Sequence, residues 1–154
     1  MLLALFLVFL AIYHLPFFRK KALWNTFGER VTWAMATPLL FIGGLHLLLP
    51  DEFTSLIPDW LPDWMPENES LVLGGGVALL AGGGGLLIKK IRKKVSYGVI
   101  AMLASFLPAN LHMAQNGYEL SNGDPLLDPG SAIGWGQVPL QFIYMALAWW
   151  IGRK

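Results

Sequence analysis

Histidine, glutamine and tyrosine side chains are the chemically capable groups of this chain, and they interrupt long apolar stretches. His46 lies near the end of one stretch and His112 near the end of another. Histidine titrates near pH 7 and so can carry protons, and two facing histidines can hold a haem iron. Glutamine and tyrosine beside them could bond the carbonyl of a quinone head group.

Spacing places several of these residues on one face of a helix. Ser105, Pro108 and His112 follow one another at intervals of three and four, which is a helical stripe. Pro108 cannot donate to the carbonyl of Ala104, so a kink is expected there. Asn110 lies about 200° round a regular helix from His112 and should face elsewhere unless the kink turns it.

A second polar stripe is formed by Gln137, Gln141 and Tyr144, at i, i+4 and i+7. Both stripes should face the interior of a helix bundle. Because successive helices alternate in direction, both stripes would reach the same end of the bundle as His46. We therefore expect an outward-opening polar pocket with these candidate residues: His46, Ser105, Asn110, His112, Gln137, Gln141 and Tyr144.

Three uses of such a pocket compete. The residue types favour hydrogen bonds between helices, each worth ~0.6–2 kcal/mol. A quinone-like small molecule is the second use. Haem held by His46 and His112 has no further motif to support it, and zinc lacks a third ligand. No cofactor or metal is therefore predicted, and quinone is kept as the alternative ligand.

Five apolar segments must position these residues. Apolar residues make up 55% of the 154, and charged residues only 14%, against about 25% in globular domains. The segments hold no Asp, Glu, Lys or Arg and approach the ~20 residues that a membrane-spanning helix needs. They are 1–18, 32–50, 71–88, 95–114 and 133–151. The near-zero net charge of +1 argues against a nucleic-acid partner, and the absence of cysteine excludes disulfides and thiolate sites.

The connectors between these segments are sorted by charge. All 11 Lys and Arg residues lie in 19–30, in 89–94 or at the C-terminus, whereas nine of the ten acids lie in 51–70 and 115–132. Because basic connectors stay in the cytoplasm, the N-terminus is expected outside, the C-terminus inside, and the two acidic loops outside. Segment 1–18 lacks a basic start and is followed by FFRKK, which predicts a retained helix and not a cleaved signal.

The third segment is rich in glycine. Gly74, Ala78 and Gly82 recur every four residues, and Gly85 lies on the same side. Such a stripe of small residues lets helix backbones approach closely. Tight helix packing is favoured over a flexible helix beside a transported substrate.

The acidic loop 51–70 contains the repeat PDWLPDW and four closely spaced prolines if Pro50 is included. Frequent proline opposes a long helix. Trp60 and Trp64 suit the headgroup layer, where aromatic residues anchor membrane proteins. A loop that caps the bundle is favoured over a docking surface for an extracytoplasmic partner.

Four motifs resemble the DoxX-like family of small bacterial membrane proteins. They are GGLHLLLP at 43–50, IPDWLP at 57–62, FLPANLHMA at 106–114 and VPLQFIYMALAWW at 138–150. The FLPAN and PLQ pieces are the most specific, and a glycine-rich helix and a basic turn lie between the motifs. The resemblance covers about residues 30–151.

This resemblance implies an all-α, polytopic membrane bundle with a four-helix DoxX-like core, here with an extra N-terminal transmembrane helix, in the bacterial cytoplasmic membrane. Some members of the family accompany membrane redox enzymes. Many relatives have Glu where this chain has Ala78 and Arg where it has Gln137, so a family site built on that pair would be missing. His46, Pro108, Asn110 and Gln141 match the family pattern.

A single membrane domain, 1–154, is therefore expected. The favoured function is a non-catalytic membrane subunit that serves a membrane or extracytoplasmic redox protein. The alternatives are a quinone-binding oxidoreductase component and a small-solute transporter, the latter disfavoured because the apolar segments hold no carboxylate.

Overall fold

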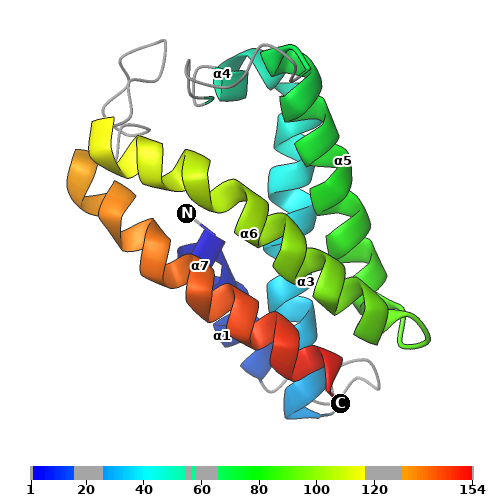
Figure 1. Ribbon diagram of the computed structural model, residues 1–154. Coiled ribbons are helices and arrows are strands. Elements are labelled where there is room, and N and C mark those ends of the chain that lie inside the picture. Colours follow the sequence, from blue (N-terminus) through cyan, green and yellow to red (C-terminus); the bar gives the residue numbers. More distant parts are fainter. Residues whose placement is uncertain (1, 16–25, 55–56, 58–65, 117–129, 154) are drawn as a thin grey trace.

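A computed structural model describes residues 2–15, 26–54, 57, 66–116 and 130–153, and their regular elements are all helices (Figure 1). No strand occurs among these residues, which confirms the expected all-α class for the described part of the chain. The helices are α1 (Leu2–His14), α3 (Phe27–Leu48), α4 (Pro50–Thr54), α5 (Asn68–Leu87), α6 (Arg92–Asn116) and α7 (Gly130–Gly152).

The four long helices match the predicted segments and extend them by a few residues at most ends. α3 and α5 are each long and apolar enough to cross a membrane, with 22 and 20 residues. α1 is shorter than predicted, because it ends at His14 and not at residue 18. The next residue, Leu15, precedes Pro16, and the residue before a proline disfavours helical geometry. Residues 16–18 lie outside the described chain.

The helices form two pairs and one added helix. α3 packs along α5, and α6 packs along α7, while α1 lies against α3 (Figure 1). Smaller contacts join α5 to α6 and α3 to α7. The short helix α4 lies beside the start of α5, at one end of the molecule and within the predicted loop 51–70.

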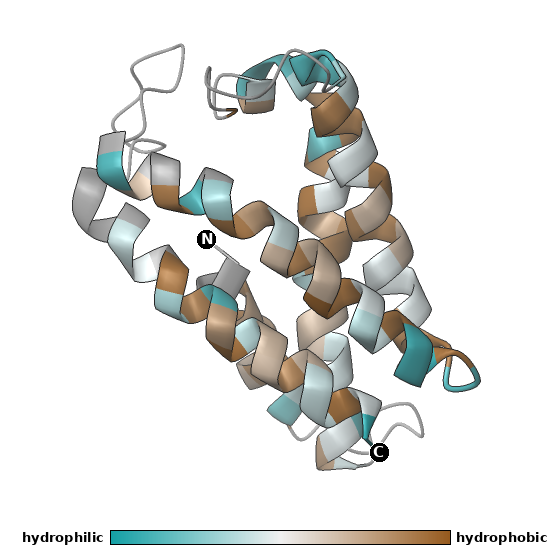
Figure 2. Ribbon diagram, viewed as in Figure 1, coloured by the Kyte–Doolittle hydropathy of each residue, from teal (hydrophilic) through white to brown (hydrophobic). Residues whose placement is uncertain are grey.

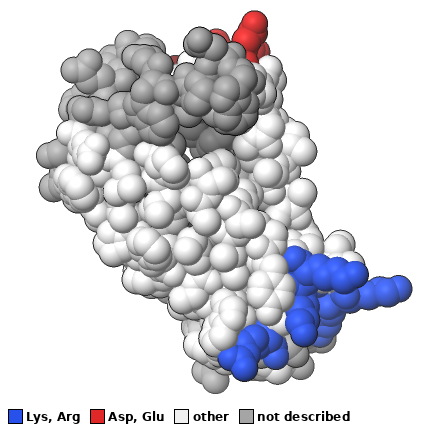
Figure 3. All heavy atoms as spheres, in the orientation of Figure 1, with Lys and Arg blue, Asp and Glu red and all other residues white. Residues whose placement is uncertain are grey.

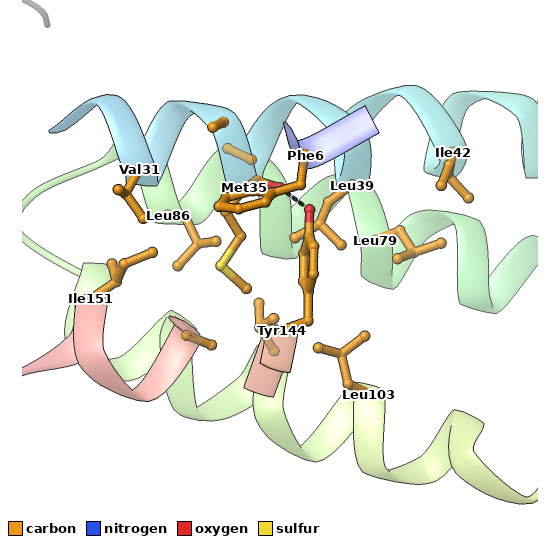
Figure 4. Packing of buried hydrophobic residues seen from close by; sticks show 14 of the residues in the cluster. Phe6, Val31, Met35, Leu39, Ile42, Leu79, Leu86, Leu103, Tyr144 and Ile151 are labelled. Carbon is orange, nitrogen blue, oxygen red and sulfur yellow. Dashed lines mark hydrogen bonds between the residues drawn. The ribbon is translucent and has the colours of Figure 1, made fainter. Parts of the chain in front are cut away.

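The core lies where the two pairs and α1 meet (Figure 4). This core includes Met35 and Leu39 of α3, Leu86 of α5, Leu103 of α6 and Tyr144 of α7, and all five are almost fully buried. Phe6 of α1 contacts the Tyr144 ring edge-on at 5.7 Å between centroids. The N-terminal helix is thus part of the same core.

α3 and α5 meet through glycine. A side chain at Gly76 would lie 2.8 Å from Cβ of His46 and 3.1 Å from the carbonyl oxygen of Gly43. A side chain at Gly83 would lie 3.0 Å from the carbonyl oxygen of Ala36. These separations leave no room for a Cβ atom, so the two backbones are in direct contact.

The predicted glycine stripe is only partly correct. Gly82 and Gly85 are buried, but against Val99 and Val95 of α6 and not along a single seam with the others. Gly74 has nothing within 4 Å of where its side chain would be, and Ala78 is exposed. α5 packs on two neighbours at once, and its closest contact, with α3, uses a different face from the predicted one.

Charge is sorted to opposite ends of the molecule (Figure 3). Arg30 lies in the first turn of α3 and the basic turn 89–94 follows α5, while Asp51 and Glu52 lie beyond the other end of α3. α3 has 22 residues and so spans about 33 Å, close to the thickness of a hydrocarbon layer. Among the described acids, Glu29 alone lies at the basic end.

Candidate functional site

The polar stripe of α7 faces the core, as predicted. Gln141 and Tyr144 are 6% and 1% exposed. Gln137 begins the predicted stripe and lies in α7, but its side chain is outside the described part. Two of the three stripe residues are therefore shown to point into the bundle.

Gln141 joins α7 to α6 through two hydrogen bonds. Its Oε1 accepts from Nδ2 of Asn110 at 2.8 Å, and its Nε2 donates to the carbonyl oxygen of Leu103. Leu103 lies just over one turn before Pro108, whose missing N–H leaves the carbonyl of Ala104 without its helical donor. Asn110 faces this contact despite its offset from His112, and the FLPAN and PLQ pieces thus meet in space.

Tyr144 joins α7 to α3 in the same way. Its hydroxyl donates to the carbonyl oxygen of Met35 at 3.3 Å (Figure 4). Met35 lies three residues before Pro38, which is inside α3 and loosens the local hydrogen-bond ladder. α7 therefore supplies polar donors to backbone carbonyls near the prolines of two other helices.

Two other predicted pocket residues bond elsewhere. Nδ1 of His46 bonds the carbonyl of Ile42 in its own helix at 2.8 Å, and its ring stacks on Phe53 at 3.9 Å between centroids. Ser105 is exposed and donates to the carbonyl of Met102, also in its own helix, at 2.7 Å.

The remaining predicted site residues lie outside the described part. The side chain of His112 is not described, although its backbone belongs to α6. The interfacial anchors Trp60 and Trp64 and most of the loop 115–132 are likewise not described. The structure therefore brings together Asn110, Gln141 and Tyr144, and separates them from His46 and Ser105. Within the described ranges, no three His, Asp or Glu side chains form a group that could hold a metal ion.

A second polar cluster lies at the basic end, where the sequence favoured a topology signal at 89–94 over a site for anionic lipid. Arg92 makes a two-pronged contact with Glu29, with both N–O distances 3.1 Å. Arg92 Nε also donates to the carbonyl of Leu86 at the end of α5, at 2.8 Å. Lys89 Nζ lies 3.3 Å from Glu29. One guanidinium thus ties the starts of α3 and α6 to the end of α5.

Glu29 lies before the predicted span 32–50, at the edge of the bundle. The hydrogen bonds from Arg92 lower the pKa of this carboxyl below its ordinary value, and burial opposes the shift without reversing it. The pair is mostly shielded, with side-chain exposures of 14% for Arg92 and 15% for Glu29. The sequence signal that could have identified this pair is the position of Glu29, a single acid among the bases of its connector.

His14 and Arg30 also lie at the basic end. Arg30 is 8% exposed, and its Nε donates to Nε2 of His14 at 3.3 Å. This places His14 at the opposite end of the molecule from His46.

A cavity of about 740 Å³ opens beside the Glu29–Arg92 pair. Its walls come from the first turn of α3, the start of α6 and the last turn of α7. Lys89, Lys93 and Arg153 contribute charge, and Trp150 and Phe27 contribute aromatic surface. The cavity is thus strongly cationic, with a single carboxylate that already has partners.

Comparison with known proteins gives a family but no activity. No curated protein matches the chain, and no solved structure does. One family, described as a domain of unknown function (DUF8561), matches residues 35–152, from within α3 to the end of α7. Since this match covers more than half of the sequence, the chain belongs to the DUF8561 family.

Proposed function

We propose that this chain is a multi-pass, non-catalytic membrane subunit whose basic end lies at the cytoplasmic surface of a bacterial membrane. The observation that carries the proposal is the separation of charge along apolar helices. The described Lys and Arg residues gather at one end, and Asp51, Glu52, Glu67 and Glu69 at the other. Connectors rich in Lys and Arg remain in the cytoplasm.

The outward faces of the helices support a lipid environment. Large apolar side chains are about half exposed on four helices, at Val8, Phe41, Val77 and Phe142. Hydrophilic residues lie at the start of α5 and in the turn that follows its end, while apolar residues and glycine make up the rest of the helix (Figure 2). In water, apolar surface of this extent would favour aggregation, whereas in a bilayer it faces lipid.

The proposed architecture is a DoxX-like core of four spanning helices, α3, α5, α6 and α7, with α1 as an added fifth span. The family match begins at residue 35 and leaves α1 outside it. The contact of Phe6 with Tyr144 supports a retained N-terminal helix. The DoxX-like relationship rests on the FLPAN and PLQ motifs, whose Asn110 and Gln141 bond one another.

The non-catalytic role rests on what the buried polar residues do. Gln141 and Tyr144 bond backbone carbonyls of neighbouring helices, so they hold the bundle together. A quinone at the same place would have to replace these bonds. Service to a membrane redox complex is the partner role that the DoxX-like resemblance implies, and co-purification from native membranes tests it.

The topology can be tested directly because the chain has no cysteine. We expect Glu69→Cys to react with a membrane-impermeant maleimide in intact cells. Lys90→Cys should react only after the membrane is opened. Labelling of both positions from the same side would overturn the proposal.

The non-catalytic assignment has its own test. The purified protein is extracted with organic solvent, and the extract is analysed for quinones by mass spectrometry. We expect no stoichiometric quinone. A quinone present at one per chain and lost in Gln141→Leu would overturn this part of the proposal.

A further inference from the structure

Two cavities meet at the basic end of the molecule. The cationic cavity of about 740 Å³ includes Phe27 and Trp150 in its wall. A second cavity of about 440 Å³ shares these two residues and is otherwise lined by Phe6, Leu10, Val31 and Leu147. The Phe27 and Trp150 rings lie edge-to-face at 6.1 Å between centroids. The charged cavity and the apolar groove between α1, α3 and α7 therefore lie side by side and share a wall of two aromatic rings.

We propose that this composite site binds one anionic phospholipid, with its phosphate in the cationic cavity and an acyl chain in the apolar groove. The inference rests on the proposed membrane function and names a ligand for the basic end. The basic end would lie at the headgroup layer, where anionic lipids are present.

The charges of the cavity suit a phosphate. Four cationic side chains line it, and Glu29 is its one acid. Glu29 is already bonded by Arg92 on both oxygens, so the other cations are in excess. Lys89 is 77% exposed despite its contact with Glu29, and Lys93 and Arg153 are also exposed. Arg153 stacks over Trp149 at 4.4 Å, which orients its guanidinium at the rim.

The apolar groove selects a lipid over a free anion. Inorganic phosphate could use the cations but would gain nothing from Leu10, Val31 and Leu147. An acyl chain in a bilayer is already out of water, so the groove offers it close packing and not a hydrophobic gain. Affinity should therefore depend mainly on head-group charge, and the groove should fix where the chain lies.

The basic turn supplies a matched control. Lys89 and Lys93 line the cavity, whereas Lys90 and Lys94 belong to the same turn and do not line it. The double variants K89Q/K93Q and K90Q/K94Q remove the same charge. Two lysines that lie beside an anionic head group together strengthen binding roughly ten- to thirtyfold.

The measurement is native mass spectrometry of the full chain in detergent, titrated with dioleoyl phosphatidylglycerol or dioleoyl phosphatidylcholine. We expect one phosphatidylglycerol retained in preference to phosphatidylcholine, a ten- to thirtyfold weaker retention in K89Q/K93Q, and little change in K90Q/K94Q. Equal weakening in both double variants would overturn the site, because it would show only general attraction to the basic turn.

A groove variant separates lipid from free phosphate. Leu147→Trp fills the groove without changing charge and should weaken phosphatidylglycerol retention while the thermal unfolding temperature stays near that of the parent. If sodium phosphate alone raises that temperature as much as the lipid does, and Leu147→Trp has no effect, the site binds free phosphate and the lipid proposal fails. Since the cysteine labelling is separate, loss of lipid selectivity with correct labelling rejects this inference alone.

Discussion

The two helix pairs of this molecule are held together by different means. α3 and α5 meet backbone to backbone at Gly43, Gly76 and Gly83. α7 instead reaches its neighbours with side chains, through Gln141 to α6 and Tyr144 to α3. The first contact depends on the absence of side chains, and the second on polar groups that bond backbone carbonyls of neighbouring helices. Close packing and hydrogen bonding can both join helices, and both occur in this molecule.

The largest loss of stability is expected from a substitution in the glycine contact between α3 and α5. Gly83→Leu should destabilise the protein by roughly 3 kcal/mol, because overpacking at a fixed backbone contact forces the helices apart. The carbonyl of Ala36, 3.0 Å from the new Cβ, cannot move aside as a side chain could. Gly84→Leu is the control, since nothing lies within 4 Å of its Cβ position. Denaturant titration in detergent measures the free energy of unfolding of both variants. An equal loss of stability in the two would contradict the backbone contact at Gly83.

The ionic contact at the basic end sharpens the comparison, because it joins the glycine-packed pair to α6. Arg92→Gln should lower the free energy of unfolding by roughly 2 kcal/mol, which is the typical contribution of a hydrogen bond to a charged group. It removes the bonds to Glu29 and to the Leu86 carbonyl. Lys94→Gln, in the same helical turn, is the control and should change little. An unchanged unfolding midpoint in Arg92→Gln would show that the pair is worth nothing to stability.

Acid should weaken the same contact by less. The pKa of Glu29 is lowered in the folded protein by Arg92, so its stabilising contribution is present above the ordinary carboxyl pKa and is lost as pH falls through the lower, folded value. The measurement is unfolding in detergent between pH 6 and pH 3. We expect the parent to lose more stability than Glu29→Gln over this range. If the stability of both proteins fell equally with pH, the lowered pKa of Glu29 would be contradicted.

Removing the polar contact of α7 should destabilise the protein less than overpacking the glycine contact does. Gln141→Leu removes its two interhelical bonds and leaves Asn110 without this acceptor, for a loss of roughly 1 kcal/mol. A double-mutant cycle with Asn110→Leu isolates the bond between them. Additive losses would show that the two side chains do not interact.

The smallest effect is expected for Tyr144→Phe. It removes only the hydroxyl that donates to Met35 over 3.3 Å, and single bonds of this kind in membrane proteins average about 0.6 kcal/mol. The ring remains in the core beside Phe6. Tyr144→Ala is the contrast, since it also empties the core and should cost several times more. If Tyr144→Phe and Tyr144→Ala lost similar amounts of stability, the hydroxyl and not the ring would be the stabilising group.

The sequence predicted the helices, the sorting of charge to two ends and the inward face of α7. These features follow from apolar runs and from helical spacing, which are local properties. The choice among glycines was not predictable, because α5 has two neighbours and its repeat of small residues marks several faces equally. Gly74 and Ala78 fit the pattern as well as Gly76 and Gly83 do, but only the latter pair meets α3.

The polar site was predicted in part for a similar reason. Spacing alone placed Gln141 and Tyr144 correctly, but it could not show that they bond backbone carbonyls of two different helices. Nor could it show that His46 bonds within its own helix. The cavity at the basic end depends on three helix ends that are far apart in the chain, so no local pattern reveals it.

The attachment of α7 through side-chain donors has a consequence for biogenesis. The ribosome releases α3, α5 and α6 before α7, and early elements generally fold first. The glycine contact can therefore close while the carbonyls of Met35 and Leu103 still await their donors. Docking of α7 is then the last step of assembly, and nascent chains stalled before residue 141 should present a bundle without these two bonds, which chaperones and proteases can recognise.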